Sequence, residues 1–448
     1  MNEISIKERA DRIRDVIRYI SKFKNSTVVI YIDDRIIDSS LFSNHIHDIF
    51  LMKEAGLKVI LVPGAHKRIN EVLSANNINW TIKNKTRITE PDAMTLIKMA
   101  AFEVANNVMT SLASVHITAV IGNWVRARGK GVISGIDYGT AGEIDKIDED
   151  SINTVLNNGF IPIFPCIGWS LNGKPYNISS MHLSSQIATK MNAEKLFFLI
   201  PDIEISDKNF TIPKSIGISP EGHIPAMNIE ELDLFMSENI DKKTIDTNNI
   251  SDIISALELS KYACSNGVSR THLLNGFFNG ALPCEIFSNL GAGTMIYSYD
   301  YGKIRSMHRE DISQVLSLIR PFVIKEILLP RTEKDLEKTF NDYIVYEIDG
   351  SIRACAALHI YDRNQAEIAA VAVDENCSHI GIGPKLIEYL IQKAKIINIK
   401  SIFLLTTKTA DWFENLGFKS DSIDTLPQKR KEILDKKRGS KVLRLILN

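Results

Sequence analysis

Two glycines that precede a helical segment could hold the phosphate groups of a ligand. They are Gly381 and Gly383, in the stretch EIAAVAVDENCSHIGIGPKLIEYLIQKAK from Glu367 to Lys395. The stretch begins as an apolar run, and its second half carries apolar residues at helical spacing: Ile387, Leu390, Ile391 and Ala394. A helix N-terminus behind a glycine loop presents free backbone N–H groups and a positive dipole end to an anion. The alternative is a glycine turn without a ligand.

This stretch resembles the acetyl-CoA binding segment of the GNAT acetyltransferases. Gly381 and Gly383 match the family pattern Arg/Gln-x-x-Gly-x-Gly, and Ser378 stands at its leading position. A serine donates one hydrogen bond there, whereas an arginine would also add a charge. The resemblance implies acetyl-CoA as co-substrate, with its pantetheine arm on the strand and its pyrophosphate at the glycine loop.

Within the GNAT family, the segment is most similar to the catalytic domain of bacterial N-acetylglutamate synthases. Four pieces carry the resemblance in the same order: ACAAL (354–358), EIAAVAV (367–373), LTTKTADWFENLGF (405–418), and DTLPQKRKEI followed by RGSKVL, which ends at residue 443. The implied reaction transfers the acetyl group of acetyl-CoA to the α-amine of L-glutamate. It gives N-acetyl-L-glutamate and begins arginine biosynthesis.

The resemblance assigns catalytic roles to four positions. Glu367 would be the general base, and Thr406 would be the acid that protonates the leaving thiolate. The backbone N–H groups of Ala372 and Val373 would hold the thioester oxygen at a strand bulge. A carboxylate is a weak base toward an amine, so transfer through water is one route. The alternative for Glu367 is an exposed glutamate at a strand edge.

The two carboxylates of glutamate require fixed cations. By resemblance these are Arg331, Arg430 and Arg438, and Ser440 joins them. The alternative is that the Lys/Arg-rich run from 429 to 441 forms a solvated helix face.

The size and composition of the chain limit what it can be. Its 448 residues should form two or three domains, and 44% hydrophobic residues are ordinary for a globular protein. A net charge of −1 gives no footprint for nucleic acid, and no apolar run suggests a membrane span or a signal peptide. The five cysteines form no C-x-x-C pair and indicate reduced thiols in a cytoplasmic protein. We expect no metal.

Residues 1–299 show strands that alternate with helices, which predicts a three-layer α/β domain with a mainly parallel sheet. This region resembles the amino acid kinase fold in the segments 54–70, 135–148, 176–180 and 192–196. Where the kinases carry a lysine followed by two glycines, the chain has Tyr31, Asp33 and Asp34. Two carboxylates in a phosphate loop would repel a nucleotide, so we expect no kinase activity.

Arginine-sensitive proteins of this group bind L-arginine through residues that match Tyr19, Lys195, His272, Glu285 and Gly291. The resemblance therefore implies that domain 1–299 is a regulatory domain with L-arginine as effector. It also implies a homo-oligomer, by resemblance a hexamer. Each residue alone could equally be a surface glutamate or a core histidine.

Residues 300–448 predict a second domain, with the α+β fold of the GNAT acetyltransferases. Asp349-Gly350 between two β-rich runs predicts a hairpin within it. Two other functions remain open. The chain could be a GNAT enzyme for another amine, or an arginine-binding regulatory protein with an inactive transferase domain.

Overall fold

The chain divides into two compact units, residues 1–299 and 300–448, in a computed structural model. The structure describes residues 13, 14, 16, 17, 20–83, 85–213, 215–219, 221–239, 248–287, 292–298, 302–348, 350–362, 364–374, 377, 381–435 and 438–447. Within these ranges, no helix has the length and apolar character needed to cross a membrane.

The first unit is built on an eight-stranded sheet with the order β14-β16-β15-β13-β1-β2-β10-β5. Adjacent strands run parallel except for β15 and β16, so the predicted mainly parallel sheet is confirmed. The strands are β1 (Thr27–Ile32), β2 (Lys58–Pro63), β5 (Ala119–Ile121), β10 (Ile161–Ile163), β13 (Lys195–Ile200), β14 (Ala226–Asn228), β15 (Arg270–Asn275) and β16 (Gly293–Tyr297).

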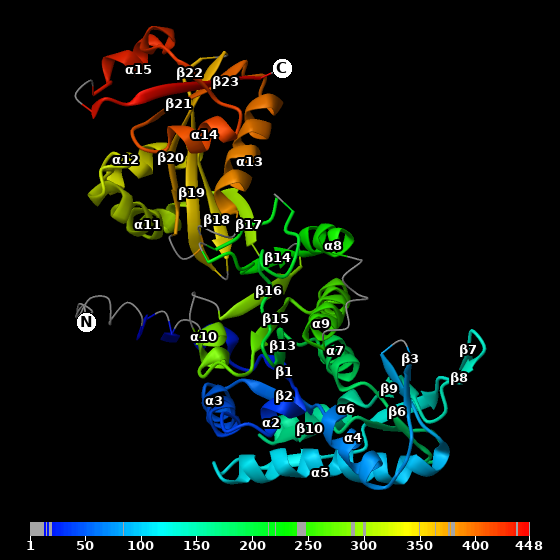
Figure 1. The fold of residues 1–448 in the computed structure, drawn as a ribbon. Helices are drawn as coiled ribbons and strands as arrows, with labels where there is room; N and C mark the ends of the chain where they lie inside the picture. Colours follow the sequence, from blue (N-terminus) through cyan, green and yellow to red (C-terminus); the bar gives the residue numbers. More distant parts are fainter. Residues whose placement is uncertain are drawn as a thin grey trace. The chain divides into compact units, whose positions relative to one another are not determined.

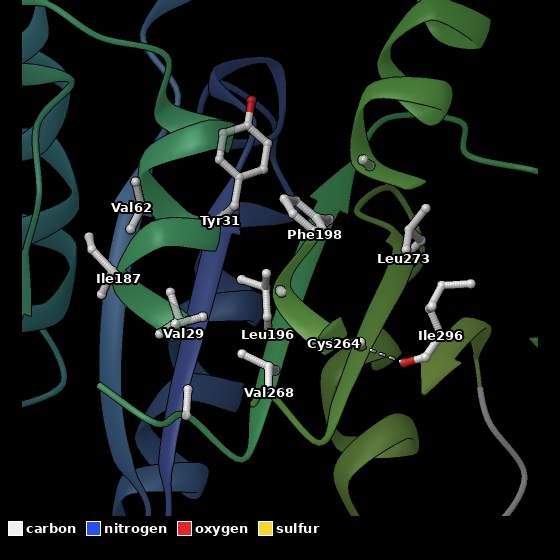
Figure 2. Close-up of a cluster of buried hydrophobic side chains, with 14 of the residues drawn as sticks. Val29, Tyr31, Val62, Ile187, Leu196, Phe198, Cys264, Val268, Leu273 and Ile296 are labelled. Atoms are coloured by element: carbon white, nitrogen blue, oxygen red, sulfur yellow. Dashed lines mark hydrogen bonds between the residues drawn. The ribbon is translucent and has the colours of Figure 1, made fainter. Parts of the chain in front are cut away.

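Helices cover both faces of this sheet, which makes three layers (Figure 1). The continuous apolar run of β1 explains why, because successive side chains of a strand point to opposite faces. Val29 and Tyr31 lie on the same side as Leu196 and Phe198 (Figure 2), whereas Val28 and Ile30 pack into the opposite core. The helices are α2 (Asp34–Ile37), α3 (Phe42–Glu54), α4 (His66–Ala75), η1 (Pro91–Ala93), α5 (Met94–Ala113), α6 (Glu149–Asn157), α7 (Ser180–Lys190), α8 (Ile229–Glu238), α9 (Asn248–Ser265) and α10 (Ala281–Phe287).

Short strands add smaller sheets to this unit. A four-stranded sheet has the order β12-β11-β6-β9, and β3–β4 and β7–β8 form two-stranded hairpins. Their bounds are β3 (Thr81–Lys83), β4 (Thr86–Ile88), β6 (Val125–Gly129), β7 (Val132–Ile133), β8 (Ile136–Asp137), β9 (Gly142–Ile147), β11 (Ile167–Trp169) and β12 (Pro175–Asn177).

The second unit is built on a seven-stranded sheet with the order β17-β18-β19-β20-β21-β23-β22. All neighbours are antiparallel except β20 and β21, so the α+β expectation is confirmed. Ile348 pairs with Ser351 at the predicted hairpin. The strands are β17 (Gly302–Ser306), β18 (Tyr343–Ile348), β19 (Ser351–Ile360), β20 (Gln365–Val373), β21 (Ser401–Thr406), β22 (Lys419–Asp421) and β23 (Lys441–Ile446).

Helices flank this sheet on both faces too. One core packs α13 and α14 against Ala354, Ala356 and Leu358, and another packs α11 and α12 against Cys355 and Ala357 of the same strand. The helices are η3 (Arg309–Asp311), α11 (Ile312–Ile324), α12 (Glu333–Thr339), η4 (Phe340–Asp342), α13 (Ile382–Ile396), α14 (Ala410–Asn415), η6 (Ile423–Thr425) and α15 (Gln428–Glu432).

Candidate active site

A cleft opens in the second unit where β20 and β21 separate. These parallel strands pair only between Gln365–Glu367 and Ser401–Phe403, and beyond that point they have no common register. Its lining comes from β20, from β21 and from the segments around Arg331 and Arg430. Five residues singled out from the sequence line it: Arg331, Glu367, Arg430, Arg438 and Ser440.

Glu367 lies on the wall of this cleft and is only 5% exposed. Because β20 lies between β19 and β21, the alternative of an exposed strand-edge glutamate is excluded. Its Oε2 accepts hydrogen bonds of 2.9 Å from the Tyr361 hydroxyl and of 2.9 Å from Arg430 Nε. Within the described part of the chain, Oε1 accepts none. One carboxylate oxygen is therefore held by the protein, and the other is available to a substrate.

The three arginines of the cleft differ in how they are held. Arg430 is buried and uses Nε on Glu367, which leaves its two terminal nitrogens without a partner among the described residues. Arg438 Nη2 donates to the carbonyl oxygens of Glu326 and Ile327 at 3.2 and 2.6 Å. The Arg331 guanidinium lies 5.7 Å from the ring centroid of Tyr343.

The Lys/Arg-rich run is not a uniform solvated face. Lys429 is exposed, whereas the adjacent Arg430 is buried and Arg438 is half-buried. The cleft is lined by three guanidinium groups and two carboxylates, those of Glu367 and the exposed Asp435. This lining complements a ligand that brings more negative than positive charge.

The bulge of β20 lies slightly earlier than the expected oxyanion position. Ala370 and Val371 together oppose a single residue of β19, and Ala370 has a left-handed backbone with φ of 52°. Ala372 and Val373 already pair with Cys355 and Ala354 in the regular ladder. The bulge is therefore at Ala370 and Val371, directly before the two residues expected to hold the thioester oxygen.

The expected pyrophosphate site is the N-terminus of α13. Gly381 caps this 15-residue helix with φ of 68°, a conformation that favours glycine. A Cβ on Gly383 would lie 3.1 Å from Trp412 Cζ2, so the second glycine allows close packing of the loop. Ser378 lies outside the described residues.

Thr406 ends β21 and is largely buried. Its hydroxyl lies 2.8 Å from the Thr409 hydroxyl and accepts a hydrogen bond from the Thr409 backbone N–H. Its neighbour Leu405 lines the cleft, but Thr406 does not.

In the first unit, carboxylates occupy the region of the kinase phosphate loop. Asp34 Oδ2 accepts from the backbone N–H of Lys67 at 2.5 Å, in the first turn of α4. Asp33 forms an ion pair of 2.7 Å with Arg35, which also bonds to Asp252 at 2.8 Å. The place that an anionic ligand would take at this helix end is therefore held by the chain's own Asp34.

Three of the five residues expected to bind arginine lie close together. Lys195 on β13 is buried with its ammonium 4.5 Å from the Phe23 ring centroid, and His272 Nδ1 lies 2.8 Å from Glu285 Oε1. Burial lowers the pKa of His272 to about 4, so its ring is neutral at physiological pH. Its Nε2 is buried and has no hydrogen-bond partner among the residues that the structure describes. Tyr19 and Gly291 lie outside the described residues.

Two contacts at these sites were missed by reasoning from the sequence. Tyr361 bonds to Glu367, and the Phe23 ring lies beside both Lys195 and Arg270. An isolated aromatic residue beside a strand carries no motif, so the sequence held no signal for either. Within the described residues, no cluster of histidine, cysteine and acidic side chains could hold a metal ion.

Comparisons with known proteins agree with this architecture. Residues 9–211 match the amino acid kinase family and residues 309–418 match the acetyltransferase (GNAT) family. The chain is 32% identical over 446 residues to an amino-acid acetyltransferase of Vibrio vulnificus, which covers 96% of both chains. It is similar to an N-acetylglutamate synthase from Neisseria gonorrhoeae solved with coenzyme A and L-arginine, with 28% identity, a TM-score of 0.77 and coverage of 99% and 100%. A structure of that synthase with coenzyme A and N-acetyl-glutamate matches with a TM-score of 0.59 over the same coverage and at the same identity.

Proposed function

The chain belongs to the amino-acid acetyltransferase family, and we propose that it acetylates the α-amine of L-glutamate with acetyl-CoA. The observation that carries this proposal is the cleft between β20 and β21, where a carboxylate and three guanidinium groups converge. An amino acid with two carboxylates matches those cations, and its ammonium matches the carboxylate.

Different residues of the cleft bind the substrate and transfer its proton. Arg331, Arg438 and the terminal nitrogens of Arg430 bind the two substrate carboxylates, and Ser440 adds a hydroxyl donor. Glu367 Oε1 removes a proton from the ammonium, directly or through water. The free amine then attacks the thioester carbonyl carbon and the new C–N bond forms. The attacking nitrogen loses its second proton, which ends on the departing sulfur, and the C–S bond breaks.

The CoA thiolate leaves with the electron pair of the C–S bond. Thr406 is the candidate acid for it, although a thiol with an ordinary pKa of about 8.5 leaves readily without strong acid help. Backbone N–H groups at the bulge of β20 would stabilise the oxyanion. The N-terminus of α13, with Gly381, Gly383 and the loop that contains Ser378, would hold the pyrophosphate.

We assign an arginine-binding role to the first unit. The neutral His272 ring presents Nε2 as a buried acceptor, and the Glu285 carboxylate adds negative charge beside it. The Glu285 carboxylate already accepts from His272 Nδ1 and from the Ala292 backbone N–H, so a guanidinium would donate to His272 Nε2 and be attracted by the carboxylate charge. The Lys195 ammonium could take the α-carboxylate. The loop that contains Asp33 and Asp34 is assigned no kinase function.

The protein is proposed to act in the cytoplasm as a homo-oligomer. Its five cysteines are all free thiols, which fits a reducing compartment. Gel filtration with light scattering would give the number of subunits directly.

The test is the release of free CoA thiol from acetyl-CoA with L-glutamate, with and without L-arginine. We expect turnover with glutamate, at least about tenfold lower kcat/KM with glutamine, which lacks one carboxylate, and a rate that changes with arginine. Glu367→Gln should abolish most of the activity. Turnover with a polyamine but not with acidic amino acids would favour a GNAT enzyme for another amine. Arginine binding without any turnover would favour a regulatory protein.

A further inference from the structure

We propose that Tyr361 is a positioning residue that orients the Glu367 carboxylate so that Oε1 takes the substrate proton. The inference rests on the proposed function, because it assumes that Glu367 is the general base. Tyr361 directly follows β19, and Glu367 is the third residue of β20. The Tyr361 hydroxyl donates a hydrogen bond of 2.9 Å to Glu367 Oε2.

Tyr361 is held in place by one contact of its backbone and one contact of its ring. Its backbone N–H donates to the Gln365 carbonyl at 3.1 Å, within the connection between the two strands. Its ring lies 5.8 Å, centroid to centroid, from the buried ring of Phe403 on β21. These two contacts fix the position from which the Tyr361 hydroxyl donates to Glu367.

The hydroxyl acts as a donor and not as an acid. Burial, followed by the nearby Glu367 carboxylate, raises the pKa of Tyr361 well above its ordinary value. The group stays protonated across the working pH range, so its hydrogen bond to the carboxylate persists.

Two donors from different elements converge on one oxygen. Arg430 Nε, from α15, and the Tyr361 hydroxyl both bond to Oε2. A single donor would let the carboxylate rotate about its terminal bond, whereas two donors define its plane. Other ionisable side chains nearby include His359, which opposes Glu367 in the ladder and bonds to Asp342, and the cleft residues Arg331, Asp435 and Arg438.

The test compares Tyr361→Phe with wild type in the CoA-release assay. Removing only the hydroxyl should lower kcat about tenfold, because the base loses its orientation, and should leave both KM values within about twofold. Tyr389→Phe, which removes an exposed hydroxyl from α13, is the matched control and should keep wild-type kinetics.

A double-mutant cycle separates positioning from a general structural effect. At alkaline pH more of the substrate amine is already deprotonated, so the residual activity of Glu367→Gln is measurable there. If Tyr361 acts through Glu367, adding Tyr361→Phe to Glu367→Gln should cost less than twofold. The same loss in both backgrounds would overturn the proposal, as would a raised glutamate KM at unchanged kcat.

The controls distinguish this inference from the proposed function. A wild-type enzyme that releases no CoA with glutamate would refute the function and the inference together. Wild-type turnover with an unaffected Tyr361→Phe variant would refute the inference alone.

Discussion

Replacing Asp34 by asparagine should stabilise the first unit at neutral pH relative to wild type, and the advantage should disappear in mild acid. Asp34 is 5% exposed, and burial followed by the charge of Asp33 raises its pKa from 3.8 to about 6. Asparagine keeps a side-chain oxygen that can accept from the Lys67 N–H but carries no charge.

The direction of this pH dependence follows from the linkage between protonation of Asp34 and folding. A carboxylate whose pKa is higher in the folded state than in the unfolded state stabilises the fold when it is protonated, and this contribution is lost as pH rises through about 6. The wild-type free energy of unfolding should therefore rise relative to Asp34→Asn by roughly 1 kcal/mol between pH 7 and pH 5. Below pH 4 the difference should approach at most about 3 kcal/mol.

Urea unfolding measured by tryptophan fluorescence can follow this unit alone. Three of the four tryptophans, Trp80, Trp124 and Trp169, belong to the first unit, so a Trp412→Phe background removes the signal of the second. The contributions of other titrating groups to the free energy of unfolding cancel in this comparison, because both proteins share those groups. A difference in free energy that is independent of pH between 4 and 7, or one that grows in the opposite direction, would refute the reasoning about Asp34.

Two substitutions and one assay of the unchanged protein test the remaining assignments. Arg438→Ala should raise the glutamate KM about 10- to 150-fold, the range expected for losing a charged hydrogen bond, and an equal rise in the acetyl-CoA KM would contradict its role. Thr406→Val should lower kcat by less than about tenfold, because a thiolate needs little acid help, and a loss above about 100-fold would make Thr406 essential. Radiolabelled ATP should transfer no phosphoryl group to N-acetylglutamate, whereas a labelled product would show that the carboxylates of Asp33 and Asp34 do not block the loop.

Local pattern was enough to predict the two sheets. The buried run of β1, TVVIYI, indicates a strand covered on both faces, and Asp349-Gly350 indicates the hairpin between β18 and β19. The strands of two or three residues in the smaller sheets were too short to show any period.

The active-site contacts were harder to predict than the residues that make them. Glu367, Arg430 and Arg438 were chosen by resemblance, but the bond between Glu367 and Arg430 joins positions 63 residues apart. No local signal reports such a contact. The bulge at Ala370 was also hidden, because alanine gives no sign of the left-handed backbone that glycine would announce.

The separation of β20 from β21 also bears on how the protein should be handled. Beyond their short paired region, Ile368–Val373 and Leu404–Thr406 have no strand partner within the described residues on the side that faces the cleft. Unpaired strand edges are templates for strand addition and aggregation, and here two of them lie inside a sheet. If the CoA arm binds along β20 as proposed, it would cover this edge, and purification and storage with CoA should reduce non-specific aggregation of the protein.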